Sequence, residues 1–363
     1  MGSKRINNET NKAYVLDLNM LEEGDIILEL GTSKFSYYIQ KGTNSEYSHA
    51  MLYVGHSIIH ALTDGVYSAN PQRILVESKS DLKVLRLRSK DTTTINNIVD
   101  NARQLVGSLY SKSEAIKSQI KKNTEARSKT SAQYCSKLVA NAYDIAGVSI
   151  VKNPDYCSPE DINNSELLDE IKDCVREAKK EDIEFSKSRN PILENQKSTF
   201  KYLSDCRELF KKVHINIQGE ADVAPALLKH RELDSFVCGY LKDSGYLEHY
   251  DSDEYINHYR YDVDLFIERY NLSSSESKQI LISEYGSLSR IIERHIKNLS
   301  ASKQMYAQTK LEYYQLFIDL YENILLSSRK WLYTLHQFSK DVGDKDFLLL
   351  SSELLNYIDN QID

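Results

Sequence analysis

Three residues of this 363-residue chain have the chemistry of a hydrolytic site: Cys135, His49 and His60. A cysteine thiolate is a strong nucleophile, and an imidazole gains and loses its proton near neutral pH. Cys135 falls in the first turn of a helix predicted over 131–147, whose N-terminal dipole favours the thiolate. We therefore predict that Cys135 attacks a carbonyl carbon, that His49 is the general base and acid, and that His60 orients the ring of His49.

A predicted hairpin brings the two histidines together. Apolar runs at 51–54 and 57–62 flank a two-residue loop that begins with glycine, which suits a type II′ turn. This register sets Met51 opposite His60. Because side chains alternate along a strand, His49 then shares a face with His60 as its diagonal neighbour. Buried cysteines and strand histidines often have purely structural roles. The prediction of a catalytic site therefore requires that Cys135, His49 and His60 lie close together in the fold.

The remaining elements predict an α+β fold with a small, mostly antiparallel sheet and a nucleophile helix. Apolar runs and turn residues delimit the strands, and apolar residues at helical spacing mark the helices. Further strands are predicted at 25–30, 74–77 and 82–88, and further helices at 32–41 and 91–107.

The length of 363 residues favours two domains, because one core rarely grows beyond about 250–300 residues. We predict a domain with the nucleophile at 1–165 and a mainly α-helical domain at 166–363, with no hairpin after residue 160. Residues 1–150 carry 19 Lys and Arg against 15 Asp and Glu, a net +4, and residues 151–363 carry 27 against 38, a net −11. The difference in charge indicates two parts with different surfaces.

Composition excludes several classes of function. A net charge of −7 argues against a general nucleic-acid binder. The five cysteines contain no C-x-x-C pair, so neither a zinc site nor a disulfide framework is indicated, and no phosphate loop or other cofactor motif is present. We expect no cofactor and no metal. The absence of an apolar signal core or membrane span predicts a cytoplasmic protein, and delivery as an effector stays open.

Two parts of the chain suggest partners. Residues 111–131 are rich in Lys and Arg and poor in apolar anchors, so we expect an exposed insert that attracts an anionic substrate or an anionic membrane surface. The acidic helical region is expected to act as a lid, to self-associate, or to bind a protein partner. The sequence does not choose among these three roles.

An ordered set of motifs resembles a known family. The motifs are Gly24-Asp25, Ser48-His49-Ala50 continuing to Gly55, Ile59-His60-Ala61, Gly107 to Tyr110, and Tyr134-Cys135-Ser136. Over about residues 21–165 the chain resembles the permuted papain-like enzymes of the YaeF/YiiX type. These belong to the NlpC-type cysteine hydrolases and are related to the lecithin:retinol acyltransferase-like group.

The resemblance implies a papain-like thiol hydrolase whose two halves are exchanged in chain order. It assigns the catalytic cysteine to Cys135, the histidine to His49 and the third polar residue to His60. Many relatives have a carboxylate at the third position, so this chain departs from them there. The N–H of Cys135 at the helix start, assisted by Tyr134, is the expected oxyanion donor.

The sequence leaves several activities open. The substrate could be an acylated small molecule, a peptide or a lipid, and the bond that is cleaved could be an amide or an ester. The acyl group of the thioester could be transferred to water or to another acceptor. The alternatives are a cell-wall peptide endopeptidase and a non-catalytic scaffold with a protein-binding helical domain.

Overall fold

The computed structural model describes residues 12–30, 46–62, 64–89, 91–110, 133–270 and 274–362. The predicted helix at 32–41 and the basic insert at 111–131 both lie outside the described residues. The chain forms two compact units. The first contains residues 1–196 and 209–223, and the second contains residues 197–208 and 224–363.

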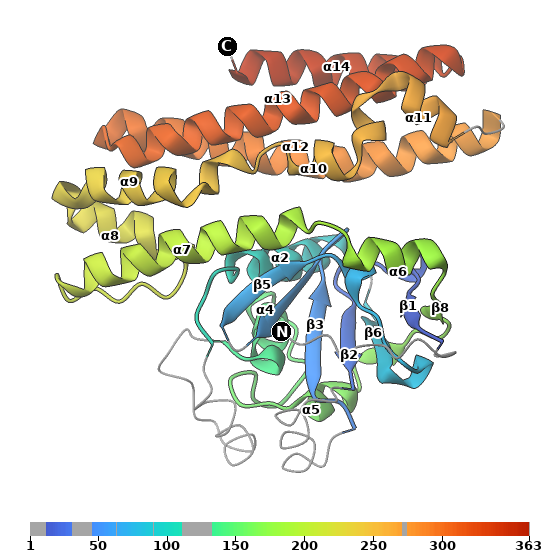
Figure 1. Cartoon of the computed structure of the whole chain (residues 1–363), viewed down its shortest axis with the longest axis horizontal. Coiled ribbons are helices and arrows are strands. Elements are labelled where there is room, and N and C mark those ends of the chain that lie inside the picture. The colour runs from blue at the N-terminus through green and yellow to red at the C-terminus, as the bar shows by residue number, and fades with distance from the viewer. Residues whose placement is uncertain are drawn as a thin grey trace. The chain divides into compact units, whose positions relative to one another are not determined.

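The first unit is built on a six-stranded antiparallel sheet with the order β5-β4-β3-β2-β6-β7 (Figure 1). Strands β1 and β8 form a separate two-stranded sheet. The strands are β1 (Tyr14–Leu16), β2 (Ile26–Glu29), β3 (His49–Tyr53), β4 (Ile58–Leu62), β5 (Gly65–Ala69), β6 (Leu82–Leu87), β7 (Leu168–Glu170) and β8 (Val175–Glu177). The helices are α2 (Thr92–Gln104), α4 (Cys135–Ile145), α5 (Pro159–Asn163) and α6 (Lys180–Lys187), followed by α7 (Pro191–Lys211).

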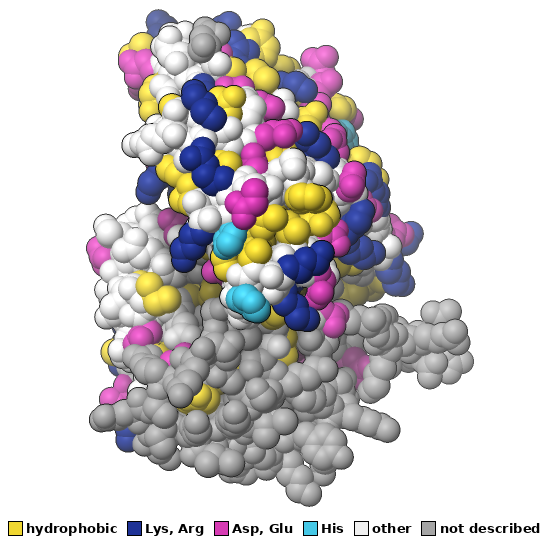
Figure 2. All heavy atoms as spheres, turned by 90° about the vertical axis from the view of Figure 1, so that its left-hand side faces the viewer, with side chains coloured by type: hydrophobic (Ala, Val, Ile, Leu, Met, Phe, Trp, Pro, Cys, Tyr) yellow, Lys and Arg dark blue, Asp and Glu magenta, His cyan; other side chains and the backbone are white. Residues whose placement is uncertain are grey.

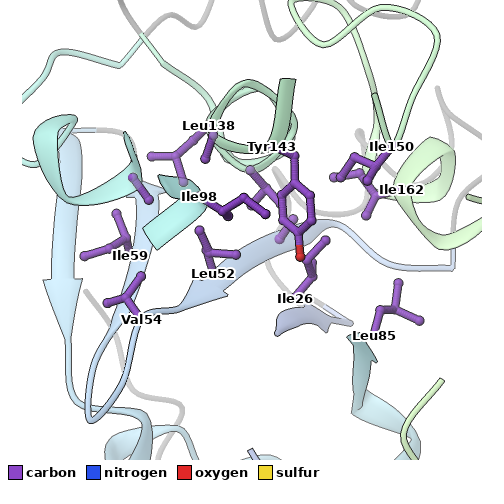
Figure 3. Close-up of a cluster of buried hydrophobic side chains, with 14 of the residues drawn as sticks. Ile26, Leu52, Val54, Ile59, Leu85, Ile98, Leu138, Tyr143, Ile150 and Ile162 are labelled. Carbon is purple, nitrogen blue, oxygen red and sulfur yellow. The ribbon is translucent and has the colours of Figure 1, made fainter. Parts of the chain in front are cut away.

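Helices α2 and α4 pack on one face of this sheet. Ile98 of α2 and Leu138 and Tyr143 of α4 meet strand residues such as Ile26 and Leu52 in a buried apolar cluster (Figure 3). The Tyr143 hydroxyl donates a hydrogen bond to the carbonyl of Gly24, which satisfies a polar group inside this core. The strands carry a second apolar cluster on their other face, so most of the sheet is buried on both sides.

The β3–β4 hairpin has the predicted register, with Leu52 opposite Ile59 and Tyr53 opposite Ile58. The predicted type II′ turn is wrong. Gly55 and His56 have φ of 75° and 57°, and positive φ at both central residues defines type I′. The Tyr53 hydroxyl accepts a hydrogen bond from the N–H of His56, which supports this conformation in a residue that has a Cβ.

The sheet extends further along the chain than predicted. Strand β5 pairs with β4 and was not predicted, and the region from residue 166, expected to be mainly helical, contains β7 and β8. The predicted strand at 74–77 is reduced to a single bridge between Val76 and Tyr14. The first unit therefore continues beyond residue 165, because β7 adds to β6 at the edge of the sheet.

The second unit is helical, as predicted. Its longest helices, α12, α13 and α14, pack side by side around a core that includes Phe266, Leu288 and Trp331 (Figure 1). Helix α12 is continuous from Ser274 to Thr309. The helices are α8 (Val223–Lys229), α9 (Asp234–Ser244), α10 (Ser252–Ile256), α11 (Val263–Arg269), α12 (Ser274–Thr309), α13 (Glu312–Asp341) and α14 (Lys345–Ile362).

Charged side chains of both signs are interspersed on the part of the surface that Figure 2 describes. Among the described helices, none combines the length and the apolar composition needed to cross a membrane. The α+β fold followed by a helical region, predicted from the sequence, is confirmed.

Candidate active site

The two predicted histidines are in direct contact. Nε2 of His49 lies 3.1 Å from Nδ1 of His60, and the two rings meet edge to face with their centroids 5.3 Å apart. Strand β3 supplies the first ring and β4 the second, so the contact follows from the hairpin register. One proton lies between these two nitrogens, because one of them must donate and the other accept.

The thiol of Cys135 lies against the strand backbone at Ser48 and Ala50, the two neighbours of His49. Its Sγ is 3.9 Å from the carbonyl oxygen of Ser48, and the N–H of Ala50 is placed to donate to the thiolate. Among the described residues, pairing between β3 and β4 ends at Leu52 and Ile59. The alternation of an antiparallel ladder directs Ala50 to the side of β4, so the sulfur occupies the position where this ladder opens.

Burial dominates the titration of the thiol. Cys135 is only 5% exposed, and this desolvation raises the pKa of its thiol above the ordinary value. The N–H groups of Ala50, Ser136 and Cys135 lower the pKa in part, since each can donate to the thiolate. We expected the helix N-terminus to prevail and to favour the thiolate. The structure instead favours a neutral thiol, because loss of water outweighs these donors.

Burial also keeps the imidazoles neutral. It lowers the pKa of His49 to about 4, and burial together with the charge on His49 lowers the pKa of His60 to about 3. At neutral pH the site therefore contains a neutral thiol and two neutral rings. If Nε2 of His49 carries its proton and donates to His60, then Nδ1 of His49 keeps a lone pair that can accept a proton.

The first turn of α4 is fixed by the loop at 153–157. The Tyr134 hydroxyl donates to the carbonyl of Asp155 at 2.9 Å, and the Ser136 hydroxyl donates to the carbonyl of Cys157 at 2.7 Å. The ammonium group of Lys137, which is 1% exposed, lies 3.8 Å from the Asp155 carboxylate. The residues on both sides of Cys135 are thus tied to one loop.

Tyr134 is not placed as expected. Its hydroxyl has one proton, which is directed to the carbonyl of Asp155, so we no longer assign it an oxyanion role. Asp25, which is also buried, has both carboxylate oxygens 2.7 Å from nitrogens of Arg86 and is part of the framework. Within the described part of the chain, no group of three His, Cys, Asp or Glu residues is arranged to hold a metal ion.

Glu29 was missed by sequence reasoning. It is the Cα partner of His49 in the β2–β3 ladder, and residues directly opposed in a ladder present their side chains on the same face. The signal in the sequence was the acidic end of an otherwise apolar strand, Ile26-Ile27-Leu28-Glu29. The register between β2 and β3 could not be predicted, because the two strands are far apart in the sequence.

Comparisons with known proteins relate part of this chain to a family. Residues 20–167 match the family model described as permuted papain-like amidase enzyme, YaeF/YiiX, C92 family. One solved structure, the metalloprotein YiiX from Escherichia coli O157:H7, matches with 18% identity and a TM-score of 0.33, over 41% of this chain and 96% of that chain. A search of curated proteins gave no match. The YaeF/YiiX resemblance is confirmed, and the matched region, that of a hydrolase family, contains both histidines and Cys135.

Proposed function

Because residues 20–167 match a family of permuted papain-like amidases, we propose that this chain cleaves an amide bond through a thioester on Cys135. His49 is the general base and acid, and His60 holds the ring of His49. The observation that carries the proposal is the contact of the Cys135 sulfur with the strand backbone on both sides of His49.

The neutral groups of the site define the first step. As Sγ of Cys135 bonds to the carbonyl carbon of the substrate, its proton passes to Nδ1 of His49, and the carbonyl oxygen becomes an oxyanion. The ring of His49 becomes an imidazolium while its Nε2–H donates to His60. The N–H of Cys135, at the start of α4, is the donor proposed for the oxyanion.

The next steps return each group to its starting state. The C–N bond breaks as His49 gives its proton to the leaving amine, which leaves a thioester on Cys135. Water then attacks the thioester carbonyl and transfers a proton to His49. The thiolate of Cys135 leaves and recovers that proton, and a carboxylic acid is released.

Acyl-enzyme formation with a p-nitrophenyl ester tests this proposal. We expect a burst of p-nitrophenol equal to the enzyme concentration and an acyl group that peptide mapping places on Cys135. Cys135→Ala should abolish both results. His49→Gln should slow the burst at least about 100-fold, the lower range for loss of a general base.

Cys157→Ala is the matched control, because Cys157 is also buried and its carbonyl lies beside the same helix turn. It should form the acyl-enzyme like the wild type. Acylation spread over several cysteines, or a burst that persists in Cys135→Ala, would contradict the proposal. Turnover of peptide amides and of lipid esters by the active protein then distinguishes the amide from the ester.

A further inference from the structure

Glu29 lies on the same face of the sheet as the histidine pair. Glu29 of β2 and His49 of β3 are Cα partners in an antiparallel ladder. The Cβ atoms of such partners lie about 4.5–5.5 Å apart on the same face, which is within reach of a glutamate side chain. His60 also lies on this face, because its ring contacts that of His49. One carboxyl group and two imidazoles therefore share this end of the sheet.

Among the described residues, no cationic side chain pairs with Glu29. In the part of the chain that the structure describes, its carboxylate has no hydrogen bond or ion pair. Its half-buried position and the nearby Asp81 of the turn before β6 raise the pKa of the carboxyl group. His49 on β3 lies directly opposite Glu29, and Asp81 acts on its carboxyl group. His60 on β4 and Tyr67, which is opposite His60 on β5, follow further along the same sheet.

We propose that Glu29 is the anionic partner of His49, and that it stabilises the imidazolium formed when His49 takes the proton of Cys135. This inference rests on the proposed function. His60 cannot supply the charge, because its own protonation is suppressed and the neutral ring offers His49 only the acceptor nitrogen Nδ1. Glu29 acts through His49, so it is a positioning residue and does not touch the substrate.

The charges explain why such a partner is needed. In this buried site a neutral thiol and a neutral imidazole must become a thiolate and an imidazolium, and burial disfavours both ions. A carboxylate within about 4–6 Å of an imidazole favours the charged ring. Protonation of Glu29 removes this stabilisation, so reactivity of Cys135 must fall as the pH drops through the pKa of Glu29.

The rate of alkylation of Cys135 by iodoacetamide, measured from pH 4.5 to 8 with peptide mapping, tests the inference without a known substrate. At pH 7 we expect Glu29→Gln to react about tenfold more slowly than the wild type, the effect of one pKa unit. The two rates should converge at low pH, because protonated glutamate and glutamine are both neutral. Glu29→Asp, which keeps the charge, should lie between them.

Glu170→Gln is the matched control, because it removes a carboxylate from edge strand β7 of the same sheet, where Glu170 pairs with Lys83 at 3.1 Å. It should follow the wild-type profile. A Glu29→Gln profile that coincides with the wild type, or that differs by the same factor at every pH, would overturn the inference. If Glu29→Gln does not fold, a wild-type rate that stays constant down to pH 4.5 would overturn it.

Failure of the proposed function gives a different result. In that case Cys135 of the wild type would react no faster than Cys157, and His49→Gln would leave the rate unchanged. That result would overturn both proposals. Selective alkylation of Cys135 that depends on His49 but not on Glu29 would leave the proposed function in place and remove this inference alone.

Discussion

Nε2 of His49 and Nδ1 of His60 lie 3.1 Å apart. Each ring therefore contacts the other ring through one nitrogen, and its second nitrogen can interact with another partner. For His49 the second nitrogen is Nδ1, the atom that the proposed mechanism requires as base. For His60 it is Nε2, which must carry the proton of the neutral ring. The pair therefore selects one tautomer for each histidine.

Replacement of His60 tests the role of its acceptor nitrogen. An asparagine side chain offers a carbonyl oxygen close to the position of Nδ1, whereas alanine offers nothing. We expect the rate of acyl-enzyme formation to fall about 100-fold in His60→Ala, within the range of general-base catalysis, and to fall less in His60→Asn. A rate in His60→Asn no higher than in His60→Ala would show that acceptance of a hydrogen bond is not its role.

The histidine pair also predicts a loss of stability in acid. Both rings have a lower pKa in the folded chain than the ordinary 6.5, so the unfolded chain binds more protons as the pH falls below 6.5. Stability contributed by the pair is present above pH 6.5 and is lost toward pH 4. Urea unfolding at pH 7 and pH 5 should differ by up to about 2 kcal/mol for each ring.

The double variant His49→Gln, His60→Gln isolates this contribution from that of the carboxylates. Its free energy of unfolding should depend less on pH between 7 and 5 than that of the wild type. An equal dependence in the two proteins would mean that the rings accept protons in the folded state.

Tyr134→Phe separates a structural tyrosine from an oxyanion donor. The variant loses one hydrogen bond to the carbonyl of Asp155, which should reduce the free energy of unfolding by about 1 kcal/mol. The rate of acyl-enzyme formation should change by less than about threefold, whereas loss of an oxyanion donor costs about 100-fold or more. A rate loss of that size would restore the catalytic role predicted from the sequence.

Arg86→Met should be among the more damaging substitutions in the sheet. Asp25 is fully buried, and burial raises the pKa of its carboxyl group even beside the guanidinium group. Removal of one partner of a buried pair costs about 3–5 kcal/mol, because the other charge is left without compensation. The double variant Asp25→Asn, Arg86→Met should be more stable than Arg86→Met alone in urea unfolding, and the reverse order would contradict this account.

The sequence predicted the hairpin part of the site well, because short-range rules determine it. A two-residue loop fixes which residues oppose each other, and alternation then places His49 beside His60. The type of turn was harder to predict, because a non-glycine residue at positive φ is uncommon and here depends on a hydrogen bond to the Tyr53 hydroxyl.

Long-range packing accounts for what the sequence could not predict. The raised pKa of Cys135 results from water excluded by elements far apart in the chain, which helix position alone does not reveal. Glu29 meets His49 only through the β2–β3 register. Strands β7 and β8 are three residues each, too short for a periodic signal, and were hidden in a segment that reads as helix.

The sheet of the first unit separates two apolar cores, and the proposed machinery draws on both. Helix α4, which carries Cys135, packs with Leu52 in one core, while His49 shares its face of β3 with Met51, which belongs to the other core. Repacking under Leu138 would shift the sulfur, and repacking around Met51 would shift the rings. A change in either core therefore alters the position of one member of the proposed dyad, and β3 is the element that belongs to both cores.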